Sequence, residues 1–219
     1  MALRAIPNGD EYDKDVARAI RYAVDNGAKI INGSFGKYFS SNPEWVIDAI
    51  RYASKKDVLV VAAAGNESKD LDLLSNDNYP NDQFFNKNEF SDTFIKVGAS
   101  TINLNENFTA YFSNYGKINV DIFAPGVDIY SSVPNDKYKF QDGTSMASPV
   151  VSGIASLIMS YFPKLSAKKV KEIILKSGID IDLKIGNLGS NKHFREYSKS
   201  GKLINAYNAL ILASKSKRE

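Results

Sequence analysis

The sequence has 219 residues, of which 43% are hydrophobic and 24% are charged, and it contains no cysteine. This length supports one domain with a substantial core, and the lack of cysteine excludes disulfides and thiolate metal sites. The net charge of +3 is small and spread along the chain, so a nucleic-acid-binding surface is not expected. We place the domain at residues 1–215 and treat 216–219 as a solvated basic tail. No apolar run is long enough to span a membrane, and the N-terminus lacks a signal-peptide pattern.

The first predicted elements are a helix and a short strand. Residues 13–27, DKDVARAIRYAVDNG, carry apolar side chains at helical spacing, with Asp13 as N-cap and Gly27 as the stop. Residues 28–36, AKIINGSFG, follow as a short apolar strand that ends in small residues. The pair predicts the start of an alternating helix and strand order.

A second helix and strand repeat the order. In residues 41–57, SNPEWVIDAIRYASKKD, Asn42 can cap the helix and Pro43 suits its first position. Residues 58–66, VLVVAAAGN, form a continuous apolar strand that runs into a glycine and an asparagine. This alternation predicts a parallel sheet covered on both faces, with ligand sites at the carboxyl ends of its strands.

The remaining elements are less regular. Residues 67–92 are polar and are predicted as a surface excursion. Residues 93–100 predict a strand, and 120–134 predict two more around a Pro-Gly turn. A helix begins near Thr144, with Pro149 expected to bend it after its first turn. Two amphipathic helices are predicted over 166–178 and within 203–214.

Several segments together resemble the subtilisin-like serine proteases, the subtilases. GTSMASPVVSG at 143–153 resembles the segment that carries the family's nucleophilic serine. IINGSFG at 30–36 is similar to the substrate-binding strand, and VVAAAGNE at 60–67 to the segment with the oxyanion asparagine. Later similarities follow in family order: YP at 79–80, FIKVGAS at 94–100, and FSNYG with APGVDIYSSVP within 112–134.

The resemblance implies a fold and a reaction. The fold would be a three-layer α/β/α arrangement with a mainly parallel sheet, without the family's N-terminal strands and helix. The reaction would be hydrolysis of a peptide bond in a polypeptide substrate through an acyl-enzyme on Ser145. Ser145 would lie at a helix N-terminus, where unpaired N–H groups favour negative charge. Asn66 would donate its side-chain amide to the same oxyanion.

The resemblance also implies a groove that binds the peptide substrate. The implied reaction requires no cofactor. The substrate would pair by β-addition with the end of one strand. The end of a second strand would form part of the pocket for the substrate side chain that precedes the scissile bond. The residues concerned are Ser34, Phe35 and Gly36 on the first strand and Ala63, Ala64 and Gly65 on the second. Some subtilases hold calcium, but the spacing of acidic residues in 67–82 matches no ligand loop, so no metal site is predicted. The carboxylates of Asp121, Asp128 and Asp142 are predicted to lie in turns or at the surface.

The base and the orienting carboxylate of the triad have no counterpart in the sequence. The only histidine is His193, which follows the serine and lacks the family's flanking glycines. Asp10, Asp13 and Asp15 lack the strand-then-turn context of the family aspartate. The N-terminus resembles the segment that follows the family histidine, so we expect a fragment whose partner is the missing N-terminal part. Such a fragment is expected to be marginally stable or to associate, and the family implies export from the cell.

Two other function classes remain open. A non-catalytic subtilase-like module would keep the peptide groove without the base. An α/β-hydrolase esterase fits less well, because residue 147 is alanine where its nucleophile motif has glycine. Without its base, the chain alone is not expected to be an efficient protease.

Overall fold

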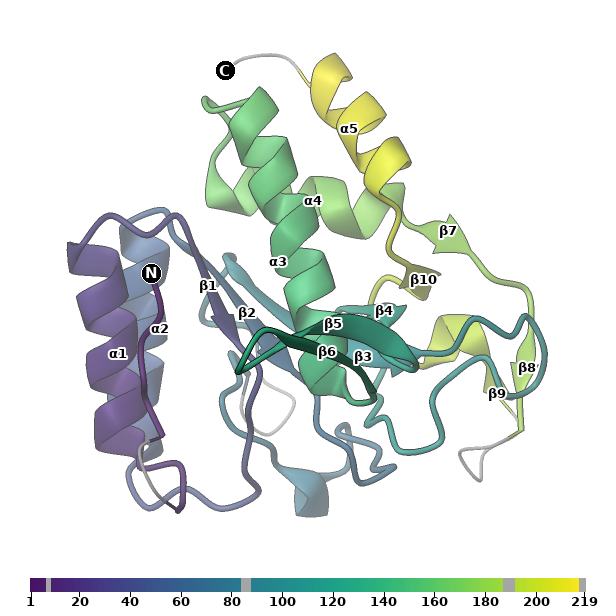
Figure 1. Cartoon of the computed structure of the whole chain (residues 1–219), viewed down its shortest axis with the longest axis horizontal. Helices are drawn as coiled ribbons and strands as arrows, with labels where there is room; N and C mark the ends of the chain where they lie inside the picture. Colours follow the sequence, from purple (N-terminus) through teal and green to yellow (C-terminus); the bar gives the residue numbers. More distant parts are fainter. Residues whose placement is uncertain (7–8, 84–87, 187–191, 217–219) are drawn as a thin grey trace.

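A central six-stranded sheet organises the molecule, as Figure 1 shows. The structure is a computed structural model that describes residues 1–6, 9–83, 88–186 and 192–216. The strand order is β1-β2-β3-β4-β10-β7, and every neighbouring pair is parallel except β10 with β7. In that order the strands are Ile30–Gly33, Leu59–Ala63, Phe94–Ser100, Ile122–Pro125, Lys202–Leu203 and Ile179–Asp180.

Helices cover both faces of this sheet, which confirms the three-layer prediction (Figure 1). Helices α1 (Asp13–Asp25) and α2 (Pro43–Lys55) pack on one face. Helices α3 (Thr144–Tyr161), α4 (Ala167–Ser177) and α5 (Ala206–Lys215) pack on the other. Strand β2 serves both cores, because its successive side chains alternate between the two faces.

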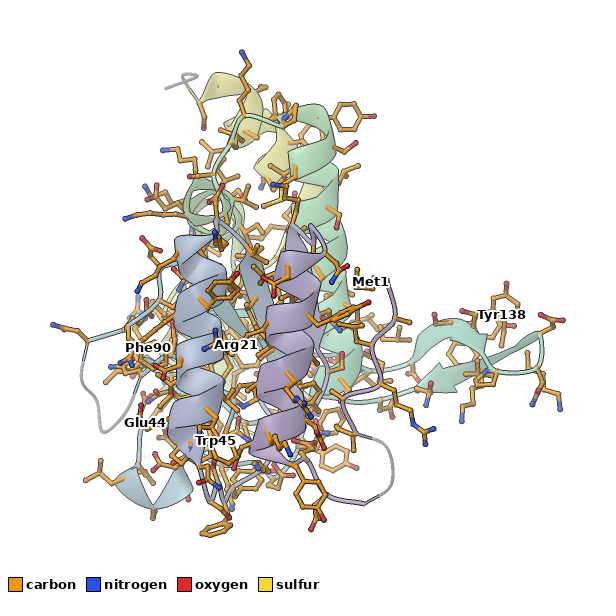
Figure 2. All side chains as sticks on the ribbon, turned by 90° about the vertical axis from the view of Figure 1, so that its left-hand side faces the viewer. Met1, Arg21, Glu44, Trp45, Phe90 and Tyr138 are labelled. Carbon is orange, nitrogen blue, oxygen red and sulfur yellow. The ribbon has the colours of Figure 1, made fainter. Side chains whose placement is uncertain are left out.

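Smaller elements lie outside the central sheet. Strands β5 (Ile129–Val133) and β6 (Lys137–Gln141) form a hairpin that projects from the body, with Tyr138 on it (Figure 2). Strands β8 (Lys184–Ile185) and β9 (Lys192–His193) pair with each other. Two single-turn 3₁₀ helices span Leu74–Asn76 and Phe194–Glu196.

Three local predictions were wrong. Helix α1 is preceded by Tyr12 as N-cap. Asp13 lies inside its first turn, and its carboxylate binds Lys37, Ser40 and the Asn42 amide instead of capping the helix. The surface prediction for 67–92 fails at 78–83, where four polar side chains are at least 91% buried. Asp121 is only 4% exposed, because its carboxylate accepts the Lys96 amide and lies 3.5 Å from the Lys171 ammonium.

The outer side of β1 faces a groove. Among the described residues, β1 pairs with no strand other than β2. The N-terminal segment, with Met1 labelled beside α1 in Figure 2, lines the groove together with α1 and β1, and the cavity measures about 530 Å³. In the part of the chain that the structure describes, no helix is long and apolar enough to cross a bilayer. Most of the expected tail lies outside the described residues, since 217–219 are not among them.

Candidate active site

Ser145 lies in the first turn of α3, where the sequence analysis expected it. The helix starts after Gly143, whose φ of +148° is a conformation that L side chains rarely adopt. A side chain at position 143 would also fill the space between the Ser145 amide and the Asn66 side chain. Its Cβ would lie 3.5 Å from the Ser145 amide nitrogen and 3.7 Å from Asn66 Nδ2. Glycine therefore keeps the space beside Ser145 open.

Asn66 follows β2 and turns its side-chain NH2 group toward this space. Its Oδ1 accepts hydrogen bonds from the Thr144 amide and the Thr144 hydroxyl, both at 2.9 Å. These two donors assign the oxygen, so Nδ2 is the atom that faces Gly143. The Thr144 hydroxyl in turn accepts a bond from the Gly65 amide at 3.0 Å. Thr144 thus orients the asparagine side chain.

Two N–H donors converge without a partner. Neither the Ser145 amide nor Asn66 Nδ2 makes a hydrogen bond to any described residue, and both lie within 3.7 Å of the same point. The Ser145 amide is one of the unpaired groups of a helix N-terminus, where the helix dipole favours negative charge. A pair of fixed donors of this kind can stabilise an oxyanion that forms next to the serine.

Ser34 and Ser145 exchange two hydrogen bonds. The Ser145 hydroxyl donates to the Ser34 carbonyl at 3.1 Å, and the Ser34 hydroxyl donates to the Ser145 carbonyl at 2.9 Å. The second bond has a clear reason, since Pro149 has no N–H to offer the Ser145 carbonyl within the helix. Helix α3 continues through Pro149 to Tyr161. Ser34 therefore supports the turn that carries Ser145, a contact that the sequence did not reveal.

A polar network beneath the two serines joins β1 to α3. Asn32 Nδ2 donates to the Ser34 hydroxyl at 2.8 Å, and Asn32 Oδ1 accepts from Ser148 and Ser152, each at 3.1 Å. Ser148 also lies 3.0 Å from the Ser34 hydroxyl. The roles of Asn32, Ser148 and Ser152 were not predicted from the sequence. The serines at positions 148 and 152, one helical turn apart on the side facing β1, were the available signal.

The predicted substrate strand lies beyond the end of β1, in extended chain. Phe35 packs with the core beneath α1 and α2. The Gly36 amide donates to Glu11 Oε1 at 3.2 Å, so the donor that an added strand would use is occupied by a side chain. Burial of Glu11 raises the pKa of its carboxyl, against the opposing effects of the Gly36 hydrogen bond and Lys37. Lys37 pairs with Tyr79 through two main-chain hydrogen bonds, which fix the far side of this segment.

The predicted pocket wall follows β2. Ala63 and Ala64 are buried, and the Ala64 amide donates to the Val97 carbonyl on β3 at 3.0 Å. Gly65 has a φ of +101° and turns the chain toward Asn66. The substrate-binding roles of these residues stay predictions.

The sequence of this chain is similar to those of known proteases. The family model described as "Subtilase family" matches residues 1–200. The chain belongs to the subtilase family. A thermophilic serine proteinase from Bacillus sp. (strain AK1) is 36% identical over 212 residues, which are 96% of this chain and 45% of that protein. The cell wall-associated protease of Bacillus subtilis (strain 168) is 37% identical over 184 residues, 84% of this chain and 18% of that protein.

Solved subtilase structures agree with the fold. The structure of the prenylagaramide maturation protease PagA matches 95% of this chain and 70% of its own, with a TM-score of 0.74 and 28% identity. This chain spans less than half the length of the two sequence relatives, the thermophilic serine proteinase and the cell wall-associated protease.

The candidate base of a subtilase mechanism is not brought to Ser145. His193 lies on β9, which Figure 1 places on the far side of β4 and β10 from β1. Its ring faces Asp182, with Nδ1 3.7 Å from Oδ1. No described carboxylate or histidine hydrogen-bonds to the Ser145 hydroxyl. The structure therefore brings the Ser145 hydroxyl, the Ser145 amide and Asn66 Nδ2 together, and among the residues described no carboxylate or histidine hydrogen-bonds to the hydroxyl.

Acidic residues in the 67–82 stretch bind main-chain donors. Asp72 accepts from the amides of Ile118 and Asn119 at 2.9–3.1 Å, and Asp70 Oδ1 accepts from the Asp72 amide. No group of three or more acidic or histidine side chains within the described ranges could hold a metal ion.

Proposed function

We propose that this chain provides the nucleophile and oxyanion half of a serine endopeptidase, with Ser145 as nucleophile. The observation that carries the proposal is the pair of unpartnered donors, Ser145 N–H and Asn66 Nδ2, beside the Ser145 hydroxyl. Ser145 Oγ would attack the scissile carbonyl carbon while a base takes its proton, and the two donors would hold the oxyanion. Collapse would release the amine with that proton, and water would then hydrolyse the acyl-enzyme. Loss of one such donor costs roughly 10²–10³ in kcat.

The proposed substrate is an extended polypeptide. It would lie along Ser34, Phe35 and Gly36, with the turn at Ala63, Ala64 and Gly65 on the other side of the scissile residue. The Gly36 amide would have to leave Glu11 for a substrate carbonyl, so binding competes with a bond already made. The reaction requires no cofactor, and we propose neither a metal nor a nucleic-acid partner.

The base would come from a segment outside these 219 residues, in the same polypeptide or in another. The support is the groove beside β1, which is lined by Met1, Leu3 and Ala5 on one side and by Ile30 and Ile31 on the other. A strand added to β1 in parallel would end where β1 ends, next to Ser34, and Ser34 contacts Ser145. Such a strand could deliver a triad residue to the hydroxyl.

A second candidate function is binding of peptides without catalysis. It is favoured by the position of His193, which lies across the sheet from Ser145. Both candidate functions bind a peptide along Ser34, Phe35 and Gly36. They differ in whether the Ser145 hydroxyl can be activated.

Export of the protein is also a proposal. One relative is named a cell wall-associated protease, whereas another from the same organism is named a major intracellular serine protease. The relatives' names therefore support either compartment.

The deciding experiment is reaction of the folded chain with a fluorophosphonate, followed by intact mass and location of the adduct. An adduct on Ser145 that disappears in Ser145→Ala, and slows in Asn66→Ala, supports the protease. Loss of the adduct in His193→Ala would make His193 the base and overturn the proposed outside segment. Because the proposed base lies outside these 219 residues, the reaction is repeated with a longer polypeptide that contains the candidate segment; no adduct there, with labelled peptide still bound by Ser145→Ala, would support the binding module.

A further inference from the structure

The turn that carries Asn66 is tied to a side chain from a distant segment. Asn114 is 0% exposed and lies just after Ser113, between β3 and β4. Its Oδ1 accepts hydrogen bonds from the amides of Glu67, at 3.2 Å, and Lys69, at 2.9 Å. Its Nδ2 donates to the Ala64 carbonyl at 2.8 Å. One side chain therefore binds the main chain both before and after Asn66.

The other hydrogen-bond donors of Asn114 also have partners. Its second Nδ2 hydrogen reaches the Tyr38 hydroxyl at 2.6 Å, and its own amide donates to the Gly65 carbonyl at 3.0 Å. An asparagine side chain offers two donors and two acceptor sites, and all four are filled here. The residue has no freedom to shift without breaking a bond to the turn.

These contacts complement those of Thr144. Thr144 orients the Asn66 side chain through its Oδ1, whereas Asn114 fixes the backbone from which that side chain starts. The Gly65 backbone at φ +101° makes this support necessary, because the chain reverses there with no side chain of its own to pack. A Cβ at Gly65 would lie 2.4 Å from Asn114 Nδ2, so the two segments are in direct contact.

Tyr38 extends the link to the substrate segment. It follows Gly36 by two residues, and its hydroxyl meets Asn114 while the Lys69 ammonium lies 4.0 Å from the centre of its ring. Asn114 thus touches both sides of the proposed groove, the oxyanion turn and the chain that continues from the substrate strand.

We propose that Asn114 is the positioning residue of the oxyanion donor, and that it sets the place of Asn66 Nδ2 without touching substrate itself. The inference rests on the proposed function for the role of Asn66, but the positioning can be measured separately. Displacement of a catalytic group by about 1 Å can cost roughly 10² in rate, so a loosened turn would have a measurable effect.

The first measurement is the order of the Asn66 side-chain NH2 group by ¹⁵N relaxation, with its signal assigned by its loss in Asn66→Asp. Asn114→Asp keeps both acceptors and removes both donors, so the Asn66 group is expected to become mobile. The matched control is Ser113→Ala. Ser113 is equally buried and holds the same segment through Ala99 and the Asn114 carbonyl, but it makes no hydrogen bond to the turn. An Asn66 group as ordered in Asn114→Asp as in the unchanged chain would overturn the proposal.

The second measurement separates positioning from general stability. It compares affinity for a peptidyl boronate, which presents a tetrahedral centre at Ser145, with affinity for the same peptide ending in a planar amide. The ratio is expected to fall roughly tenfold or more in Asn114→Asp and in Asn66→Ala, and to stay unchanged in Ser113→Ala. If Asn66→Ala leaves the ratio unchanged, the proposed oxyanion role fails, while the relaxation result still decides the role of Asn114.

Tyr38→Phe provides a milder variant should Asn114→Asp fail to fold. It removes one of the five side-chain hydrogen bonds of Asn114 and keeps the ring beneath Lys69. An intermediate loss of Asn66 order is expected. No loss of order in a folded Tyr38→Phe, together with an unfolded Asn114→Asp, would mean that Asn114 serves stability alone.

Discussion

At the scale of single residues, the site depends on bonds between a side chain and a main-chain group far away in sequence. Ser34 and Ser145 are 111 positions apart, and each hydroxyl donates to the other's carbonyl. The carbonyl of Ser145 needs this donor because Pro149 takes the place of its helical partner. A buried acceptor without a donor costs about 1–3 kcal/mol, so the bond matters for stability as well as geometry.

We therefore expect Ser34→Ala to lower the free energy of unfolding by about 1–3 kcal/mol, because the Ser145 carbonyl loses its donor. Urea unfolding followed by circular dichroism measures this. Ser156→Ala is the control, since the Ser156 hydroxyl donates within α3 to the Ser152 carbonyl and no proline deprives that carbonyl of its helical donor. Equal effects of the two substitutions would show that Ser34 has no special part in supporting α3.

The residues of the site were only partly predictable. Ser145 and Asn66 could be placed because each follows a local pattern, a helix start and a strand end, and because neighbouring segments resemble the subtilases. Asn114 could not be given a role, although its segment was noted, because the main-chain groups of the Asn66 turn that its side chain binds lie 45–50 positions earlier. Residue type and local spacing do not reveal which side chain will satisfy a distant turn.

At the scale of elements, α1 is tied at its start to the segment before α2. The Asp13 carboxylate lies 2.7 Å from the Lys37 ammonium and accepts from Ser40 and the Asn42 amide. Burial alone would raise the pKa of Asp13, but the hydrogen bonds from Lys37, Ser40 and Asn42 outweigh it and hold the pKa below its usual range. A carboxyl whose pKa is lowered by folding stabilises the fold above its unfolded-state pKa, and that stability is lost as the pH falls through the folded-state pKa.

Asp13→Asn is expected to destabilise the chain by about 1–3 kcal/mol at neutral pH, because Lys37 loses its carboxylate. The difference from the unchanged chain should shrink as the pH falls from about 5 toward 3, where the aspartate becomes protonated. Urea midpoints across this range measure it. Asp15→Asn removes a charge from the same turn and should show no such convergence. A constant difference for Asp13→Asn at all pH values would contradict the assigned ion pair.

Buried charged side chains connect residues 77–83 to β3 and α4. Lys96 is 2% exposed and donates to the Asn78 carbonyl and side chain at 3.1 and 2.9 Å. Burial lowers the pKa of Lys96 to about 7, against the opposing effect of Asp82 and Asp121. Burial, followed by Asp121, raises the pKa of Asp82 to about 7. Lys171 lies 3.9 Å from Asp82 and 3.5 Å from Asp121.

Because burial lowers the pKa of Lys96 to about 7, we expect the free energy of unfolding to rise with pH above neutrality. Between about pH 7 and 10 the unfolded chain binds a proton at Lys96 that the folded chain has released, and stability rises where the unfolded state binds more protons. Lys96→Met should therefore flatten the rise in urea midpoint over this window, whereas Lys139→Met, on the exposed β6 strand, should not. An unchanged slope in Lys96→Met would mean that the amine stays charged in the fold.

Elements were predicted well where periodicity was long. The five helices and the strands β1 to β4 follow apolar patterns that the sequence displays. The mostly exposed strand β5 was also predicted, whereas its partner β6 was not. Strands β7 to β10 are two residues each, too short to carry a period, and they form only because neighbouring chain supplies hydrogen bonds. The burial of 78–83 was missed for a related reason, since the lysines that accompany these polar residues come from β3 and α4.

At the scale of the whole molecule, β1 is an edge strand of the sheet, and within the described ranges it pairs only with β2. A strand with unpaired main-chain groups beside an apolar groove is a surface on which another extended segment can pair. The groove is lined by buried side chains of α1, by half-buried Ile30 and Ile31 of β1, and by Leu3, which is 38% exposed. The same surface would serve the proposed base-carrying segment or, in its absence, another copy of the chain.

We expect the purified chain to associate through this groove, and we expect Leu3→Lys to weaken the association, because a charge in the groove disfavours burial of an apolar partner. Light scattering coupled to size-exclusion chromatography over a series of concentrations measures this. Leu74→Lys changes a leucine that is 64% exposed on the 3₁₀ helix Leu74–Asn76, so it tests whether any added lysine has the same effect. A chain that stays monomeric at every concentration would contradict the prediction. Equal loss of association in both variants would place the contact elsewhere and remove the support that the groove gives to an added strand.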